Sequence, residues 1–310
     1  YFTLFFLLPF FGFEHQKEAS FQHQVKNPVE LVNPFIDTHD SRWFYFSSAS
    51  RPFGMVNLSP DTHTDSKWQS GYLYDSEYIR CFSHVHGWQL AGVPVMPVTG
   101  VMNGHLGMDT YKSKFSHEGE VAKPGYHKVH LDDYDVTVEL TSTTRVGFHR
   151  YAFHNNEKRY VLFDVGAFLA HGPTIDTQVK MSGPASIEGF MLLAPSGFRK
   201  KPLKVYFYAQ LEKPFSSFGT WKNNQRINSL DDSIGGRGAG AYISYPESVE
   251  QVLMKVAISY TSVENAIYNM NYELPHWNFN QVKKASEDEW NRWLGRIRVS
   301  GGTRQQQVKF

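Results

Sequence analysis

The sequence contains very little cysteine and almost no net charge. Only one of its 310 residues is cysteine, Cys81, which excludes an internal disulfide framework and a zinc site built from several cysteines. The 31 lysine and arginine residues nearly balance the 30 aspartate and glutamate residues, so the net charge is +1. Because no basic excess is available to neutralise phosphates, we expect no nucleic-acid partner.

Long hydrophobic runs are also absent. The longest apolar stretch, Phe2–Phe13, is shorter than the ~20 residues that cross a bilayer as a helix, so we expect no stable membrane span. Its length and its phenylalanine and leucine content are typical of the hydrophobic region of an export signal. We therefore predict that residues 1–20 are a signal-peptide remnant and that the protein is secreted or periplasmic. A buried N-terminal strand is the alternative.

Motifs of several enzyme classes are missing. The sequence has no Gly-x-Ser-x-Gly elbow. The glycine-rich run at 235–240 lacks the lysine and the serine or threonine that complete a P-loop. Acidic pairs such as Asp61 with Asp65, or Asp132 with Asp133, are no more frequent than chance provides among 30 acidic residues. These patterns therefore assign no catalytic residue.

What is abundant is aromatic residues and short apolar runs. The 24 Phe, 17 Tyr and 7 Trp make up 15% of the chain, which suits a thick β-sandwich core or a site for ring-shaped ligands. Short alternating or apolar runs, separated by turn residues and not by helices, predict a mostly β, antiparallel β-sandwich over residues 21–277. We expect strands at Tyr126–Leu131, Tyr134–Leu140, Val146–Phe153, Tyr160–Val165, Leu203–Leu211, Gly240–Tyr245 and Val252–Tyr260.

Helices are expected only late in the chain. Thr261-Ser262-Val263-Glu264 fits a capping box and predicts a helix over Ser262–Asn271. Apolar residues at helical spacing predict a second helix over Phe279–Arg296. Thr303-Arg304-Gln305-Gln306 fits another capping box just before the last residues. We therefore predict that residues 278–310 are a helical linker and the start of a further, helical domain.

The region 33–100 is expected to be loop-rich, and its histidines and tryptophans are candidates for binding. His84 and His86 stand two residues apart, as in some histidine metal pairs, so a metal-dependent hydrolase is one hypothesis. The alternative is that these polar side chains contact a sugar or a neighbouring loop. Trp88, like Trp68 and Trp43, could stack on the C–H face of a pyranose or simply pack in the core.

Five blocks in this region resemble the opening of glycoside hydrolase family 92, in the same order and spacing. They are V-N-P-F-I-D-T from Val32, R-P-F-G-M-V-N-L-S-P-D-T from Arg51, S-G-Y from Ser70, F-S-H-V-H from Phe82 and M-P-V-T-G from Met96. The closing G-G-T-R-Q-Q, from Gly301, resembles the junction between the two domains of that family. The segments at 41–50 and 87–92 depart from the family pattern and imply a divergent subgroup.

The resemblance implies a fold, an activity and a set of binding residues. Members of family 92 are mainly calcium-dependent, inverting exo-α-mannosidases that act on N-glycans and mannans. Their architecture is an N-terminal β-supersandwich of the galactose-mutarotase type, followed by an (α/α)6 barrel. The chain would then be the sandwich, with the catalytic carboxylates and most of the calcium site in the missing barrel. By resemblance the substrate-binding candidates are Trp88, His84, His86, Arg51 and Asp61, with no catalytic or metal-binding residue in this chain. A free-standing, non-catalytic carbohydrate-binding sandwich is the alternative function.

Overall fold

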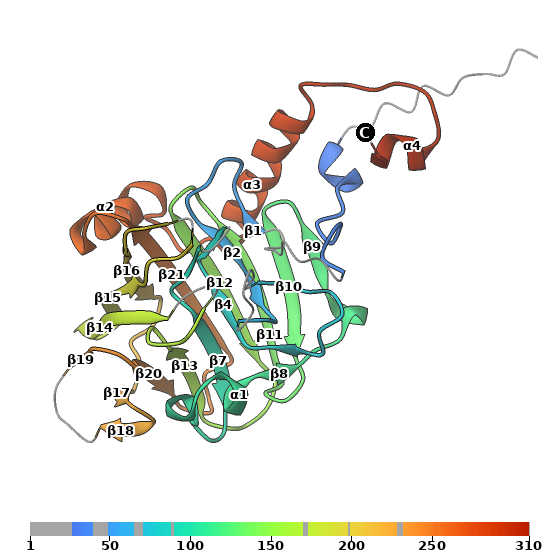
Figure 1. Cartoon of the computed structure of the whole chain (residues 1–310). Coiled ribbons are helices and arrows are strands. Elements are labelled where there is room, and N and C mark those ends of the chain that lie inside the picture. Colours follow the sequence, from blue (N-terminus) through green and yellow to red (C-terminus); the bar gives the residue numbers. More distant parts are fainter. Residues whose placement is uncertain are drawn as a thin grey trace, which may run out of the picture.

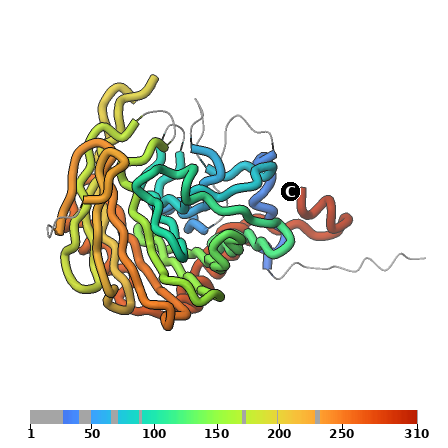
Figure 2. Tube along the Cα trace, turned by 90° about the horizontal axis from the view of Figure 1, so that it is seen from below, coloured from blue at the N-terminus to red at the C-terminus, as the bar shows by residue number. Residues whose placement is uncertain are grey.

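Two antiparallel β-sheets face each other across one core in the computed structural model (Figures 1 and 2). The structure describes residues 27–39, 49–64, 71–87, 90–169, 173–197, 199–227 and 232–309. The predicted signal-peptide remnant, residues 1–20, lies outside them. No helix of this described part is long and apolar enough to cross a membrane.

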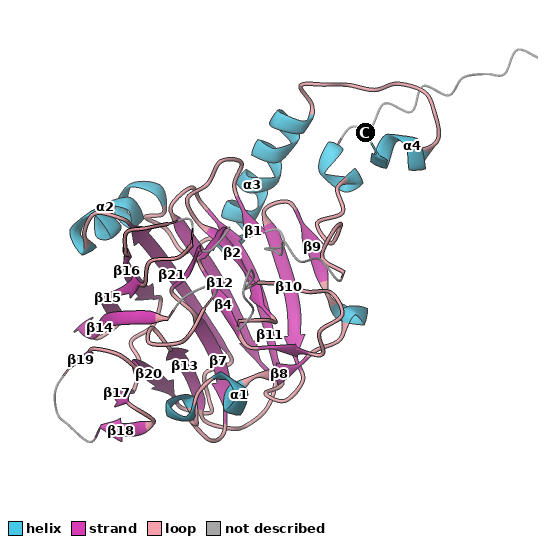
Figure 3. Cartoon of the chain, in the orientation of Figure 1, coloured by secondary structure: helices cyan, strands magenta, loops and turns pink. Residues whose placement is uncertain are grey.

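The first sheet has eight strands and the second has nine (Figure 3). In spatial order the first contains β1 (Ala49–Ser50), β2 (Asn57–Asp61), β4 (Cys81–Ser83), β7 (Val95–Thr99), β13 (Arg159–Phe163), β20 (Ala239–Tyr245), β17 (Ser217–Lys222) and β18 (Gln225–Ile227). The second contains β19 (Ser233–Gly235), β14 (Thr174–Gly183), β15 (Ser186–Leu193), β16 (Leu203–Leu211), β21 (Gln251–Ser259), β12 (Val146–Phe153), β11 (Val136–Ser142), β10 (Tyr126–Leu131) and β9 (Val121–Lys123). Two short ribbons pair β3 (Tyr78–Ile79) with β8 (Ser113–Lys114), and β5 (Val85–Gly87) with β6 (Leu90–Gly92).

The helices are few and most follow the strands. They are α1 (Met108–Tyr111), α2 (Val263–Glu273), α3 (Phe279–Leu294) and α4 (Arg304–Lys309), with 3-10 turns at Pro28–Leu31, Gly104–Leu106 and His117–Gly119. Helices α2 and α3 cover the outer face of the nine-stranded sheet, and α3 projects beyond it towards α4 (Figure 1).

Strand β12 shows how the sequence builds these layers. Its side chains alternate, so Tyr151 and Phe153 enter the core between the sheets while Val146 and Phe148 pack under the helices. Phe279 of α3 meets Phe148 with ring centroids 5.2 Å apart. Each such side chain contributes about 1.5–3 kcal/mol by leaving water, so both faces of the nine-stranded sheet stabilise the fold.

The predicted fold class and most predicted elements are confirmed. The strands at 126–131, 146–153 and 203–211 have the predicted bounds, and the other expected strands agree within two residues. Helix α2 begins one residue later than predicted, because Ser262 is the N-cap and its hydroxyl accepts from the Asn265 amide at 3.1 Å. The last capping box is present: Thr303 and Gln306 exchange backbone-to-side-chain hydrogen bonds of 2.8 and 3.3 Å.

Two expectations need correction. Helix α3 ends at Leu294, before the predicted Arg296, because Gly295 caps it, and Ile297 is 68% exposed. The region 33–100 is less loop-rich than predicted, since it supplies four strands of the eight-stranded sheet. These strands have only two to five residues, and β7 is buried at every position. Such short strands without alternation carry little signal in the sequence.

Candidate functional site

A buried ion pair joins the β5–β6 hairpin to strand β2. His86 Nε2 lies 2.8 Å from Asp61 Oδ1, and neither side chain is exposed to solvent. His86 Nδ1 lies 2.6 Å from the Asn57 carbonyl, so both ring nitrogens face acceptors. Burial opposes protonation of His86, but the Asp61 carboxylate and these hydrogen bonds raise its pKa above the usual value. The pair therefore holds β5 on β2.

Neighbouring polar groups complete the environment of Asp61. The Ser83 hydroxyl donates to Asp61 Oδ2 at 2.6 Å, and the Cys81 thiol lies 3.4 Å from the same oxygen. Burial, followed by the nearby carboxylate, raises the pKa of the Cys81 thiol. Because the thiolate is the reactive form, Cys81 is an inert core residue. Asp61 is therefore a buried hydrogen-bond acceptor between β2, β4 and β5.

His84 links the two sheets. Its Nδ1 lies 2.6 Å from the Val93 carbonyl, and its Nε2 lies 2.8 Å from Nε2 of His149 in β12. The Tyr151 hydroxyl, 2.9 Å from His149 Nδ1, completes the chain. One set of protons satisfies every group: Tyr151 donates to His149, His149 to His84, and His84 to Val93. Burial lowers the pKa of His84 to about 4 and that of His149 well below its usual range, so both rings are neutral.

Arg51 binds helix α3. Its guanidinium donates to the Ser142 carbonyl at 2.9 Å, to the Ala285 carbonyl at 3.1 Å and to Glu289 Oε2 at 2.7 Å. The Trp290 indole donates to the Ser50 carbonyl at 2.8 Å. The Arg51 side chain is only 12% exposed, so the residues before β2 fasten α3 to the sandwich.

The structure thus brings four of the five predicted site residues onto protein partners. His84, His86 and Asp61 are buried, and Arg51 faces α3. Trp88 lies outside the described residues, as do Trp43 and Trp68. Since Gly87 pairs with Leu90, Trp88 is one of the two residues that connect β5 to β6. Contact with a sugar stays a prediction for all five.

The described residues hold no group of three or more histidine, cysteine, aspartate or glutamate side chains arranged to bind a metal ion. His84 and His86 do not converge, because one faces His149 and the other faces Asp61.

Two residues of these networks were not found from the sequence. Glu289 of α3 binds Arg51, and no pattern in the sequence singled it out. His149 shares the core-facing register of β12 with Tyr151 and Phe153, and this alternation is the signal that could have found it. A histidine at a core position needs hydrogen-bond partners there.

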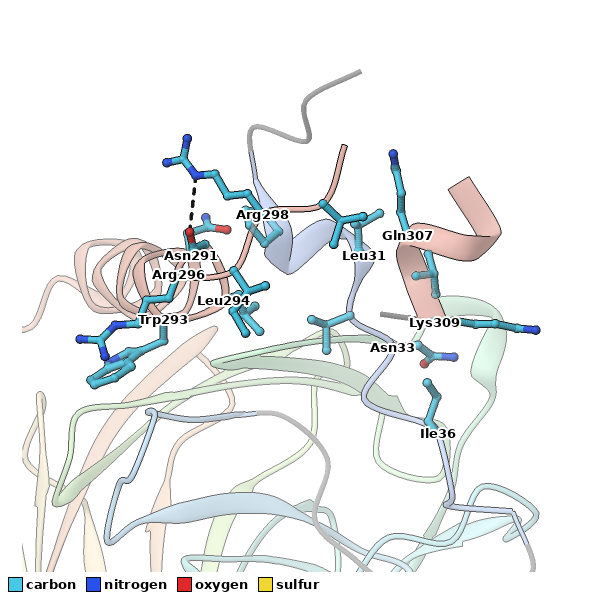
Figure 4. A pocket seen from close by; sticks show the side chains of 16 residues that line it. Leu31, Asn33, Ile36, Asn291, Trp293, Leu294, Arg296, Arg298, Gln307 and Lys309 are labelled. Atoms are coloured by element: carbon cyan, nitrogen blue, oxygen red, sulfur yellow. Dashed lines mark hydrogen bonds between the residues drawn. The ribbon is translucent and has the colours of Figure 1, made fainter. Parts of the chain in front are cut away.

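A cavity lies between the segment 28–36, before the first strand, and the segment 291–309, near the end of the chain. Its volume is about 840 Å³, and it separates the 28–36 segment from the end of α3, the linker and α4 (Figure 4). Much of its lining is apolar, contributed by Leu31, Val32, Ile36, Leu294, Ile297, Val299 and Val308. Ile36 and Ile297 are each about two-thirds exposed, 67% and 68%. An apolar cleft of this kind is typical of a surface that another domain covers.

Two protein-family models match consecutive parts of the chain. The model of the glycosyl hydrolase family 92 N-terminal domain matches residues 31–259, and the model of the family 92 catalytic domain matches residues 265–310. No curated protein matches the sequence.

Solved structures similar to this chain include α-mannosidases of the same family. The family GH92 α-mannosidase BT3965 from Bacteroides thetaiotaomicron is 27% identical with a TM-score of 0.83, covering 93% of this chain and 40% of that one. The structure of its complex with mannoimidazole is 26% identical with a TM-score of 0.82, and the match covers 92% of this chain and 39% of that one. The family GH92 inverting mannosidase BT2199 from Bacteroides thetaiotaomicron VPI-5482 is 23% identical with a TM-score of 0.79, and the match covers 93% of this chain and 39% of that one. At this identity the similarity concerns the fold alone. The chain spans about two fifths of the length of these structures.

Proposed function

The chain belongs to glycosyl hydrolase family 92, and on that premise we propose that it is the N-terminal part of an inverting exo-α-mannosidase. The observation that carries the proposal is the match of two family domains in succession, with the catalytic domain represented only by residues 265–310. The match between this chain and the related α-mannosidase covers only 40% of that protein, which supports the same proposal. We place the catalytic carboxylates in the remainder of the catalytic domain and assign none to this chain.

The proposed substrates are mannosides of N-glycans or mannans. Support comes from the related α-mannosidase that has been solved with mannoimidazole. Calcium is proposed as the cofactor of the complete enzyme. Because the described residues hold no group suited to a metal, the calcium ligands would come from the rest of the catalytic domain.

The chain's own contribution is to position a sugar-binding loop and the helix that leads into the catalytic domain. Trp88 falls in the sequence between β5 and β6, and the buried His86–Asp61 pair fixes these strands on β2. His84 ties the residue before the hairpin to the second sheet. Arg51 holds α3. We propose that Trp88 stacks on the sugar, while the other four residues keep loop and helix in place.

The proposed location is secreted or periplasmic, on the support of the apolar segment Phe2–Phe13. We also propose the division into a sandwich up to residue 277 and a helical linker from residue 278. Helices α2 and α3 both pack on the sandwich, and α4 does not share its core.

The test compares the 310-residue chain with the protein that its gene encodes in full. We expect the complete protein to release mannose from an α-mannobiose with inversion, seen by NMR as β-mannose appearing first, and to lose activity in a calcium chelator. The chain alone should release none. Mannose release by the chain alone would refute the placement of the carboxylates, and a complete protein inactive on α-mannosides would refute the function.

A further inference from the structure

A second cavity is lined by residues of α1 and of the β17–β18 hairpin, among others. These two elements lie at the end of the sandwich away from α4 (Figure 1). Its volume is about 250 Å³. Side chains from well-separated parts of the sequence line it, among them Arg80, His105, Asp164, Phe168 and Trp221. Phe168 is 44% exposed, so the cavity is reached from solvent.

Several polar residues that line this cavity have side-chain atoms without a hydrogen-bond partner among the described residues. Arg80 Nε and His105 Nδ1 are buried and have no hydrogen-bond partner among the described residues. Asp164 is 93% buried, since its exposed fraction is 7%, and its Oδ2 accepts from the Tyr111 hydroxyl at 2.8 Å. No other hydrogen bond to this carboxyl group is found in the described part of the chain. Because orphaned buried polar groups are rare and costly, two of them in a cavity that Asp164 also lines indicate a ligand.

The charge of the cavity favours a neutral ligand. Arg80 lies 2.5 Å from Asp109, and Lys112 lies 3.2 Å from the same carboxylate. Burial raises the pKa of Asp164 to about 7, in spite of the hydrogen bond from Tyr111, so this carboxyl is partly protonated near neutral pH. With charges balanced, the cavity lacks the excess of cations that would bind a phosphate.

The size and the remaining walls narrow the class of ligand further. The cavity is smaller than the ~300–1,000 Å³ of sites for drug-sized molecules. Trp221 and Phe168 add aromatic surface beside the polar groups. A ligand that is small, neutral and rich in both donors and acceptors, with an apolar C–H face, matches this lining.

We propose that this cavity binds a single hexose. Arg80 Nε donates to one hydroxyl oxygen, His105 Nδ1 bonds a second hydroxyl, and the free oxygen of Asp164 accepts from a third. An aromatic wall meets the C–H face of the ring. This binding site rests on the residues that line the cavity and does not depend on the proposed mannosidase function.

The test is a saturation-transfer NMR titration of the 310-residue chain with mannose, glucose and galactose. We expect at least one hexose to bind with a dissociation constant on the order of millimolar. Arg80→Met should weaken that binding at least about tenfold, because a hydrogen bond to a charged donor is lost. Lys112→Met is the matched control, since Lys112 also binds Asp109 but does not line the cavity. It should bind as the wild type does.

Two further measurements keep the outcome decisive. If Arg80→Met lowers the melting temperature strongly, His105→Leu takes its place and should weaken binding likewise. Trp88→Ala separates this cavity from the hairpin of the proposed mannosidase. No binding of any hexose by the wild type would overturn the proposal, and so would binding that Trp88→Ala abolishes but Arg80→Met leaves intact.

Discussion

The buried pair of histidines His84 and His149 should make the sandwich sensitive to mild acid. In the unfolded chain both rings take up protons near the usual pKa of 6.5. In the folded chain the pKa of His84 is lowered to about 4 by burial, and that of His149 is lowered as well. Between these limits the unfolded chain binds more protons than the folded one, so stability falls as pH falls below 6.5.

The magnitude follows from His84. A pKa that differs by one unit between states corresponds to about 1.4 kcal/mol. Lowering the pH from 7 to 5 should therefore cost about 2 kcal/mol through His84, because the folded ring stays neutral over that range. His149 adds a loss of the same sign. His86 acts in the opposite sense: its pKa is raised, so its contribution is present at low pH and is lost as pH rises through the folded value.

The assay is urea unfolding at pH 7 and pH 5 for the wild type and for His84→Gln. Glutamine can donate to Val93 and accept from His149, yet it does not titrate. The loss of unfolding free energy between the two pH values should be smaller by about 2 kcal/mol in the variant. His154→Gln, which removes an exposed histidine, is the matched control. Equal pH dependence of wild type and His84→Gln would refute the reasoning.

Three substitutions test the other contacts. Arg51→Met should lower the free energy of unfolding by about 1–3 kcal/mol, because the hydrogen bonds to Glu289 and to the α3 backbone are lost. Amide hydrogen exchange at residues 285–294 should become faster. Unchanged protection of these amides would contradict the role of Arg51. Asp61→Asn removes the carboxylate that faces the buried His86 ring and should cost about 3–5 kcal/mol in urea unfolding; a cost below about 1 kcal/mol would show that the pair is not ionic. Gly147→Ala places a methyl group 2.7 Å from His84 Cδ2. The melting temperature should therefore fall by an amount that corresponds to a loss of about 1–3 kcal/mol in the free energy of unfolding. An unchanged melting temperature would contradict the close packing.

Many elements of the fold could be predicted because their causes are local. Strand β12 alternates between two faces over eight residues, and such a period is legible in any window of the sequence. The capping box at Thr303 is complete within four residues. The short strands β1, β2 and β4 have no such pattern, since each is held by pairing with neighbours and not by its own composition.

The candidate site could be predicted only in part, because many of its contacts are not local in the sequence. The blocks around Arg51 and His84 marked the family, and Asp61 and His86 were named with them. Their partners were not named, because Arg51 meets Glu289 238 positions away and His84 meets His149 65 positions away. Contacts between distant residues leave no spacing to find.

The sequence by itself therefore determined the class of fold, the places where α2, α3 and α4 begin to within one residue, and the family to which the chain belongs. Only the tertiary structure decided what the polar residues of the family blocks do. It buried His84, His86 and Asp61 in hydrogen-bonded pairs and turned Arg51 towards α3. The physical reason is that period and capping act over a few residues, whereas burial and charge pairing depend on which distant segments the two sheets bring together.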